Sequence, residues 1–361
     1  MKIAQIAPLI ESVPPRLYGG TERVVSYLTE ELVALGHDVT LFASGDSITT
    51  ANLVPCVPEA LRLDPRVKDP VPYYMLMLDR VRQLSENFDV LHFHIDQFQF
   101  PVFRAIAART VTTLHGRQDL PDLLPLYLGF NDMPLVSISN DQRRPVPRAN
   151  FVKTIYHGLP LSALHPLPRP SGEYVAFLGR ISPEKRPDRA IAIARALNVP
   201  LKIAAKVDRA DEVYFREQIE PLLAEPGVEY VGEINERQKV EFLGNARALL
   251  FPIDWPEPFG LIMIEAMACG TPVIAFRSGS VPEVVDDGVT GFVVENEVDA
   301  IRAIQRLAEL DRRRVRARFE ERFTSRRMAQ EYVSCYEALV RAKPKLLQQG
   351  DADRADAMTT D

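Results

Sequence analysis

The feature of this sequence that most restricts its fold is a short apolar strand followed by a helix, repeated along the chain. In the first copy, residues 2–7 form an apolar run and residues 24–35 carry apolar side chains at helical spacing. Gly36 is placed to end this helix, and residues 38–43 form the next apolar run. Two strands joined by a helix predict a parallel sheet that is buried on both faces.

The same alternation continues on both sides of a proline-rich segment. Residues 159–172 contain four prolines in fourteen positions, which excludes a helix or a central strand and predicts a linker. Before it we expect further strands at 89–93, 110–114 and 135–138. After it we expect helices at 187–197 and 236–246, and strands at 174–178, 201–205, 228–231, 248–252, 272–275 and 291–294.

The predicted fold class is therefore α/β, with two doubly wound Rossmann-like domains that face each other across a cleft. We place the domains at residues 1–165 and 166–327, and expect the ligand at the carboxyl ends of the strands. The polar residues 350–361 are predicted to form a disordered tail. The Arg-rich stretch 312–318 is interleaved with acidic residues and is predicted to be a solvated helix face.

Composition argues against several classes of partner. The chain has 43 Lys and Arg against 49 Asp and Glu, a net charge of −6, so no positive field would attract nucleic acid or anionic lipid. Its three cysteines are far apart and form no disulfide framework. The apolar residues 1–7 are too short for a signal peptide, and no apolar window is long enough to span a membrane. We expect a soluble cytoplasmic protein; no feature fixes its oligomeric state.

Two familiar phosphate-binding motifs are missing. No G-x-G-x-x-G follows the first strand and no G-x-x-x-x-G-K-[ST] occurs, which argues against an NAD enzyme and a P-loop ATPase. Gly19 and Gly20 nevertheless lie between the first strand and the first helix. Two glycines allow a ligand close to the backbone, and the helix start offers N–H groups to an anion. The alternative is a plain turn with Thr21 as the helix N-cap.

The most informative segment is residues 254–270. Gly260 marks a loop that leads into an apolar helix, and Glu265 is the only ionisable residue between positions 259 and 269. A buried carboxylate requires hydrogen-bond donors such as ligand hydroxyls, whereas Glu257 lies at the mouth of the helix. A phosphate at the helix start would lie between the two carboxylates, an arrangement suited to a nucleotide-sugar. The alternative is a surface Glu257 and a Glu265 paired with Arg or Lys.

Arg180 and Lys185 follow the first strand of the second domain. Two cations five residues apart on such a loop can bracket a pyrophosphate, Arg as a planar fork and Lys as a point charge. The alternative is a pair of surface cations neutralised by Glu184 or Asp188.

Histidines end two strands of the first domain. His92, His94 and Asp96 have a spacing that a metal hydrolase could use, although a polar strand end that lines the cleft is the favoured interpretation. His115 also ends a strand and points toward the proposed cleft. It could bind a sugar hydroxyl or could be a structural histidine.

Together these segments resemble the retaining glycosyltransferases of family 4, which have the GT-B fold. The resemblance covers nearly the whole chain up to about residue 342, and its most specific part is the pair Glu257 and Glu265 within Glu-Pro-Phe-Gly…Glu-Ala-Met. The other matching segments fall in the family's order: Tyr18-Gly19-Gly20-Thr21-Glu22, Thr113-Leu114-His115-Gly116, Gly179-Arg180 with Lys185, Ser280-Val281-Pro282-Glu283 and Asp287-Gly288-Val289-Thr290-Gly291.

The resemblance implies a role for each matching residue. Arg180 and Lys185 would hold the diphosphate, Glu257 the donor sugar and Glu265 the ribose, and His115 would contact the sugar from the first domain. It also implies that no metal or other cofactor is needed, and that the C-terminal helix, at about 328–343, packs back on the first domain. Donor contacts from the backbone would come from Gly19, Gly20, Phe259, Gly260 and Leu261.

Two departures from the family pattern affect the expected donor or hinge contacts. Residues 277–280 read Arg-Ser-Gly-Ser where Gly-Gly is commoner, and His157 stands where Asn is frequent. The run through residues 42–47 is most similar to a bacterial subgroup that includes pterin glucosyltransferases. This similarity implies UDP-glucose as donor and suggests a pterin as acceptor. The mixed charges of residues 52–82 favour a small soluble acceptor over a membrane lipid.

The predicted reaction is the transfer of a hexose to an acceptor hydroxyl with retention at the anomeric carbon. Arg180, Lys185 and the helix start near Gly260 would stabilise the leaving diphosphate. No residue presents itself as a covalent nucleophile. The alternatives are a GT-B nucleotide-sugar epimerase, a non-catalytic nucleotide-sugar-binding module and the metal hydrolase.

Overall fold

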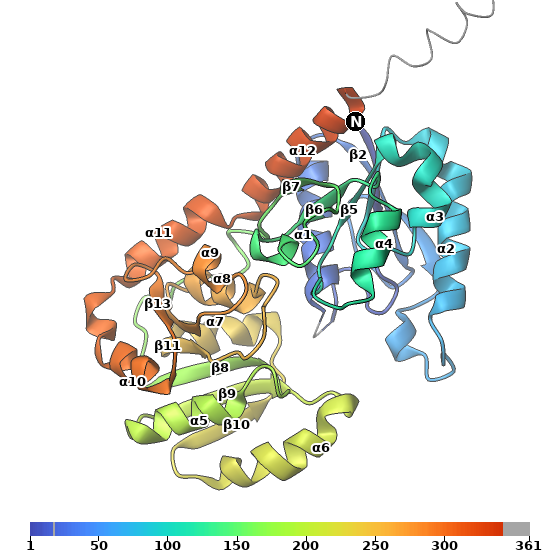
Figure 1. The fold of residues 1–361 in the computed structure, drawn as a ribbon. Helices are drawn as coiled ribbons and strands as arrows, with labels where there is room; N and C mark the ends of the chain where they lie inside the picture. Colours follow the sequence, from blue (N-terminus) through green and yellow to red (C-terminus); the bar gives the residue numbers. More distant parts are fainter. Residues whose placement is uncertain (17–18, 342–361) are drawn as a thin grey trace, which may run out of the picture.

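Two parallel sheets form the framework of the protein, which a computed structural model describes over residues 1–16 and 19–341 (Figure 1). The tail expected at 350–361, Tyr18 and the last residues expected in the C-terminal helix lie outside the described residues. The first sheet has the order β3-β2-β1-β4-β5-β6-β7 and the second β10-β9-β8-β11-β12-β13. The prediction of two doubly wound parallel sheets is confirmed.

The first sheet contains five predicted strands and two that the sequence analysis missed. The missed strands are β3 and β7, the two edges of the sheet, where side chains are mostly exposed or half-buried. An edge strand needs no continuous apolar run, so the pattern used to find strands is absent there. The seven strands are β1 (Lys2–Ile6), β2 (Asp38–Ser44), β3 (Asn52–Val57), β4 (Val90–Phe93), β5 (Thr110–Thr113), β6 (Leu135–Ser137) and β7 (Phe151–Thr154).

The six strands of the second sheet all match predicted positions to within two residues. The central strands β8, β11 and β12 are buried almost throughout, as parallel strands covered on both faces should be. They are β8 (Tyr174–Arg180), β9 (Leu201–Lys206), β10 (Val228–Gly232), β11 (Ala246–Phe251), β12 (Val273–Phe276) and β13 (Gly291–Val294).

Helices cover both sheets, and the last helix of the described chain connects the second domain back to the first. The first domain has α1 (Gly20–Ala34), α2 (Val71–Leu84), α3 (Phe100–Phe103) and α4 (Leu123–Gly129). The chain then returns from the second domain to the first in α12, which lies against α1 (Figure 1). The helices after β8 are α5 (Pro187–Ala196), α6 (Glu212–Tyr214), α7 (Glu236–Gly244), α8 (Leu261–Ala268), α9 (Val281–Val284), α10 (Glu297–Gln305), α11 (Arg312–Arg322) and α12 (Ser325–Arg341).

The packing of α12 explains how it is held on the first domain. Met328, Ala329, Tyr332 and Tyr336 are buried on one face of the helix, in a cluster with apolar residues of α1, β1 and β4.

None of the helices in the described part of the chain combines the length and the hydropathy of a membrane-spanning helix.

The Arg-rich helix α11 differs from its prediction as a solvated face. Arg312 donates to the carbonyls of Ala246 and Gly244, both at 2.7 Å. Arg316 donates to the carbonyls of Leu164 and Ala268 at 2.8 and 2.6 Å. The long side chains satisfy carbonyls at the ends of neighbouring elements, so part of this cluster fastens α11 to the second domain.

The two chain segments that connect the domains contact each other at Gly158. Leu159 forms a parallel β-bridge with Thr324, the residue before α12. A Cβ atom at Gly158 would lie 2.2 Å from the carbonyl oxygen of Thr324, far inside van der Waals contact. The backbone therefore requires glycine at this crossing.

Gly158→Ala should consequently destabilise the protein by about 1–3 kcal/mol, because the two connections must separate to admit the methyl group. Urea unfolding measures the effect. Gly129→Ala is the matched control, since a Cβ atom at Gly129 would have no neighbour within 4 Å. Equal stability of the two variants would contradict the requirement.

Candidate active site

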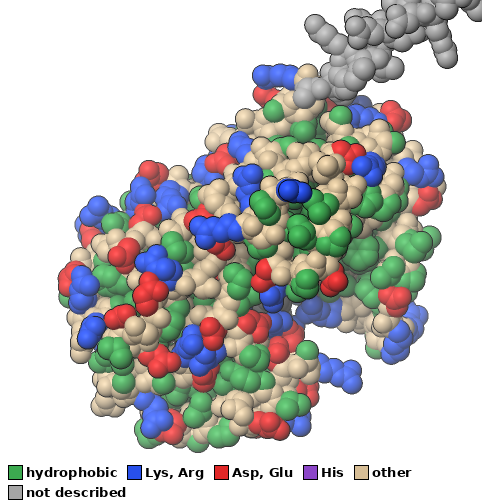
Figure 2. Space-filling model, viewed as in Figure 1, with side chains coloured by type: hydrophobic (Ala, Val, Ile, Leu, Met, Phe, Trp, Pro, Cys, Tyr) green, Lys and Arg blue, Asp and Glu red, His purple; other side chains and the backbone are tan. Residues whose placement is uncertain are grey.

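A pocket of about 430 Å³ opens between the domains at the carboxyl ends of the strands. Figure 2 shows the hollow between the two lobes, with Lys and Arg side chains at its edge. Its walls come from the loops after β1, β5, β8 and β11 and from α1 and α8. In doubly wound sheets the ligand crevice lies where the strand order reverses, here next to β1 and β8. Every predicted site residue lines this pocket: Gly19, Gly20, His115, Arg180, Lys185, Glu257, Phe259, Gly260, Leu261 and Glu265.

The two glycines of the first domain lie opposite the start of α8. Helix α1 begins at Gly20 with Gly19 as its N-cap and has no side-chain cap, so the alternative of a Thr21 N-cap is wrong. A Cβ atom at Gly20 would lie 3.6 Å from Cδ1 of Leu261, the first residue of α8. The backbone N–H groups of two helix starts thus face the same space.

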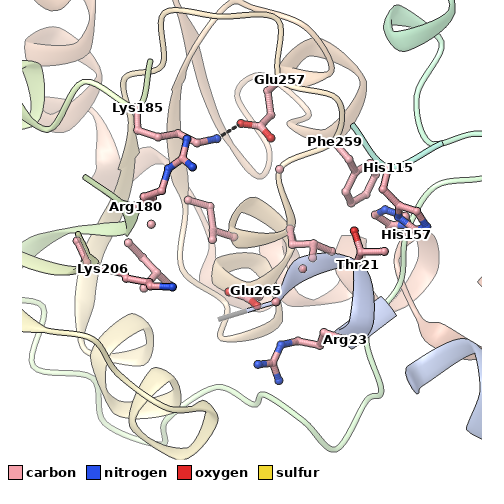
Figure 3. A pocket seen from close by; sticks show the side chains of 18 of the residues that line it. Thr21, Arg23, His115, His157, Arg180, Lys185, Lys206, Glu257, Phe259 and Glu265 are labelled. Carbon is pink, nitrogen blue, oxygen red and sulfur yellow. Dashed lines mark hydrogen bonds and ion pairs between the residues drawn. The ribbon is translucent and has the colours of Figure 1, made fainter. Parts of the chain in front are cut away.

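Lys185 and Glu257 form an ion pair in the wall of the pocket (Figure 3). The same Glu257 oxygen accepts a hydrogen bond from the Trp255 indole at 3.1 Å, and the Lys185 ammonium lies 4.7 Å from the centre of that ring. Glu257 is 9% exposed, so the carboxylate is held in place largely out of water.

Residues 277–280, where the sequence departs from the family pattern, hold the loop around Glu257 in place through the backbone. The Ser278 hydroxyl donates to the carbonyl of Trp255 at 2.6 Å, and the Ser280 amide donates to the carbonyl of Glu257 at 2.9 Å. Gly279 has φ +55°, and a Cβ atom there would lie 2.3 Å from the Glu257 carbonyl oxygen. Only glycine allows this close approach.

Arg180 is the second cation of the predicted pair, and it is surrounded by carboxylates. It pairs with Glu184, as the alternative interpretation expected, and lies 3.5 Å from both Asp208 and Asp211. Lys206 points into the same part of the pocket and is 3.0 Å from Asp208 (Figure 3). A diphosphate in this position would replace carboxylates as the partner of these cations.

Glu265 has one partnered and one unpartnered oxygen. It is 2% exposed, and its Oε1 accepts from Lys239 at 2.8 Å, whereas its Oε2 has no hydrogen-bond partner within the described residues. Burial alone would lower the pKa of Lys239, but Glu265 and Glu236 outweigh burial and raise it. Glu236 also pairs with Arg23 of α1 at 3.2 Å, so this group of charges connects the two domains.

His115 is oriented by a chain of buried polar side chains. The Gln5 carbonyl oxygen can only accept, so Nε2 of His94, 2.8 Å away, carries hydrogen. Burial lowers the pKa of His94 and keeps its ring neutral, so its Nδ1 accepts from Nε2 of His115 at 2.9 Å. In this assignment Nδ1 of His115 is the unprotonated nitrogen, able to accept from a ligand hydroxyl. Burial also lowers the pKa of His115 to about 3, so the ring is neutral at pH 7.

The same chain continues to α12 through His92. Nδ1 of His92 is 2.7 Å from the Tyr336 hydroxyl, and its Nε2 is 2.7 Å from the Thr113 hydroxyl. Both ring nitrogens are therefore engaged, which leaves His92 no open position as a metal ligand. Within residues 1–16 and 19–341, no group of three or more His, Cys, Asp and Glu side chains is arranged to hold a metal ion.

Several pocket residues were missed by the sequence analysis. Arg23, Lys206 and Lys239 line the pocket, although their patterns are those of ordinary helix and strand ends. Lys206 could have been predicted as a pocket residue, because it lies at the carboxyl end of β9, directly beside Arg180 at the end of the neighbouring strand β8. His157 stacks on His115 with ring centres 5.3 Å apart, and its buried Nδ1 has no partner within the described residues.

Comparison with known proteins covers both halves of the chain. The family described as Glycosyltransferase Family 4 matches residues 18–197, and Glycosyl transferases group 1 matches residues 166–325. N-acetyl-alpha-D-glucosaminyl L-malate synthase of Bacillus anthracis is 26% identical over 90% of this chain and 95% of its own length. Alpha-maltose-1-phosphate synthase of Mycolicibacterium smegmatis is 33% identical, but the match covers only 37% of this chain and 36% of that protein.

Solved structures share the fold over most of the chain. Sucrose-phosphate synthase from Thermosynechococcus elongatus has a TM-score of 0.78 at 20% identity and covers 95% of this chain and 100% of its own. HepE of Anabaena, solved with UDP and glucose, has a TM-score of 0.71 at 19% identity, with 94% and 100% covered. The chain thus belongs to glycosyltransferase family 4, as a retaining GT-B enzyme that transfers a sugar from a nucleotide-sugar.

Proposed function

We propose that this enzyme transfers glucose from UDP-glucose to a hydroxyl group of a small soluble acceptor. The observation that carries the proposal is the position of Lys185, Glu257 and Glu265 around the start of α8. A sugar at Glu257, a diphosphate at Arg180 and Lys185 and a ribose at Glu265 would occupy one continuous pocket. HepE, whose structures hold UDP and UDP-glucose, supports the choice of donor.

The remaining predicted residues would complete the donor site. The backbone N–H groups of Phe259, Gly260 and Leu261 lie at the N-terminus of α8, where helix geometry leaves them free for phosphate or sugar oxygens. Gly19 and Gly20 would allow the diphosphate close to the start of α1. Nδ1 of His115 would accept from a sugar hydroxyl across the cleft.

In the proposed reaction, the bond between the anomeric carbon and the diphosphate oxygen breaks while the acceptor oxygen bonds to the same carbon. The acceptor proton passes to the leaving phosphate oxygen on the face of departure, so the configuration is retained. Arg180 and Lys185 stabilise the negative charge that develops on the diphosphate. Closure of the domains excludes water and limits hydrolysis of the donor.

Calorimetric titration with UDP, GDP and ADP is the direct test of the donor site. We expect UDP to bind more tightly than GDP and ADP, because the proposed donor is UDP-glucose. All three nucleotides share the ribose that the proposal assigns to Glu265 and the diphosphate that it assigns to Arg180 and Lys185, so selectivity among them reports contacts to the base. Failure of all three nucleotides to bind would overturn this assignment.

Glu265→Gln should weaken UDP binding by about tenfold to a hundredfold, because a charged acceptor for the ribose hydroxyls becomes a neutral one. The matched control is Glu229→Gln, since Glu229 pairs with Lys202 at 2.9 Å on the outer part of the second sheet and does not line the pocket. Titration of both variants measures the difference. Unchanged UDP affinity in Glu265→Gln would remove Glu265 from the donor site.

Product analysis separates the proposal from the alternative activities. A nucleotide-sugar epimerase would convert UDP-glucose without an acceptor, and a binding module would leave it intact. We expect glycosylated product only when an acceptor alcohol is added.

The three cysteines are free, with Cys269 and Cys335 buried, which is consistent with the cytoplasmic location that we propose.

A further inference from the structure

A second cavity adjoins the donor pocket on the side of the first domain. It has a volume of about 380 Å³ and shares Thr21, Glu22 and His115 with the donor pocket. The residues that belong to it alone come from α2 and from the segments that follow β1, β4 and β5. A molecule in this cavity would lie directly beside a sugar held at His115.

The two cavities differ in charge. Six Lys and Arg side chains are among the residues that line the donor pocket. None is among the described residues that line the second cavity, whose charged residues are Glu22 and Asp96. Its histidines, His94 and His115, are kept neutral by burial, which lowers the pKa of both. An anion would therefore meet two carboxylates and no cation there.

Glu22 gives the cavity a fixed acidic group. The residue is 6% exposed, and no ion pair or side-chain hydrogen bond to it occurs within the described part of the chain. Burial raises the pKa of Glu22 despite hydrogen bonds from nearby backbone amides. The carboxyl group already accepts hydrogen bonds from backbone amides, and its place in the cavity wall positions it to accept a further one from a ligand.

An aromatic pair forms another wall of the cavity. The rings of Tyr74 and Phe98 stack with centres 5.3 Å apart and planes 7° from parallel. Tyr74 is buried and its hydroxyl accepts from the Leu9 amide at 3.1 Å, so this ring is fixed. Phe98 lies on it, is 46% exposed and lines the cavity, so its ring offers apolar surface to a planar ligand.

We infer that this cavity binds the acceptor and selects a planar, uncharged or cationic ring compound that carries the reacting hydroxyl. The ring would stack on Phe98, and its O–H or N–H groups would donate to Glu22 and Asp96. Phosphorylated or carboxylated acceptors would be rejected, because no cation of the cavity would balance their charge. The inference deepens the proposed function and rests on it.

The test compares acceptors that differ in charge or in the ring. With UDP-glucose as donor, the aromatic pair is 4-(2-hydroxyethyl)phenol against 4-hydroxyphenyllactate, and the non-aromatic pair is myo-inositol against inositol 3-phosphate. 6-(Hydroxymethyl)pterin adds a planar ring rich in N–H donors. We expect transfer to the neutral aromatic alcohols at a rate at least tenfold above that to either anion.

Three variants connect this preference with the cavity. Phe98→Ala should raise KM for the neutral aromatic acceptor about tenfold without changing the affinity for UDP. Leu120→Ala is its matched control, because Leu120 is equally exposed and does not line the cavity. Asp96→Lys should shift the preference toward 4-hydroxyphenyllactate.

The outcomes distinguish this inference from the proposed donor chemistry. A faster reaction with the anionic acceptors, or no transfer to any aromatic alcohol while UDP still binds, would overturn the acceptor assignment alone. An unchanged KM in Phe98→Ala would do the same. If the unaltered enzyme does not bind UDP, that result would instead contradict the proposed function.

Discussion

Lys185→Ala is expected to lower the rate of sugar transfer by about a hundredfold to a thousandfold, the loss typical when one hydrogen-bond donor to a transition-state oxyanion is removed. Lys185 lies within hydrogen-bond distance of Glu257 and over the Trp255 ring, so its ammonium is already positioned before the donor binds. Little reorganisation is then required as charge develops on the diphosphate.

The variant would also leave Glu257 without its cation beside the donor phosphates. A buried carboxylate without a cation repels a diphosphate, so UDP affinity should fall together with the rate. Lys185→Ala combined with Glu257→Gln separates the two effects. The double variant should recover protein stability and part of the UDP affinity, but not the rate of transfer.

Initial rates with UDP-glucose and an acceptor measure the effect, and Lys202→Ala provides the control. Lys202 is also paired with a glutamate, Glu229 at 2.9 Å, but lies away from the pocket on β9. Equal rates for Lys185→Ala and Lys202→Ala would exclude Lys185 from transition-state stabilisation.

The elements that the sequence predicts well are those whose burial leaves a simple pattern. The central strands β8, β11 and β12 are apolar throughout, because both of their faces are covered. Edge strands β3 and β7 carry mixed side chains and were not found. Their pairing depends on the neighbouring strand rather than on their own composition.

The candidate site follows the same logic. Loops after strands must meet at one end of a parallel sheet, so Arg180 and Glu257 could be placed together from their positions alone. His115 belongs to the other sheet, and its place opposite them follows only if the two domains face each other across a cleft. The partners of these residues could not be predicted, because a contact between Lys239 and Glu265 depends on how α7 packs against α8. The arginines of α11 show the same limit, since the carbonyls that they bind are supplied by other elements.

Stability toward acid is the second large effect that the structure predicts. His92, His94 and His157 are each at most 3% exposed, and burial lowers the pKa of all three well below its usual range. In the unfolded chain these rings would take up protons near pH 6.5, whereas in the folded protein they stay neutral. The unfolded state thus binds more protons, and the free energy of unfolding falls as the pH falls below about 6.5.

The expected slope is steep. Each buried histidine contributes about 1.4 kcal/mol per pH unit once its unfolded form is protonated, so three contribute about 4 kcal/mol per unit. His115 acts in the same direction, because burial lowers its pKa to about 3. Glu22 acts in the opposite direction, since burial raises its pKa, and burial likewise raises the pKa of Glu11, Asp96 and Asp211. The unfolded values of these carboxyl groups lie near pH 4, below the value near 6.5 at which the histidines of the unfolded chain take up protons.

Urea unfolding between pH 7.5 and 5 measures this slope, and His157→Asn tests its origin. The variant should lower the slope by about one proton, or about 1.4 kcal/mol per pH unit, because one buried ring is removed. His165→Asn is the control, since His165 is exposed and should leave the slope unchanged. If His157→Asn keeps the full slope, the acid sensitivity does not arise from His157. If the slope falls as expected, the neutral state of the buried His157 ring, which stacks on His115, is supported by a measurement independent of catalysis.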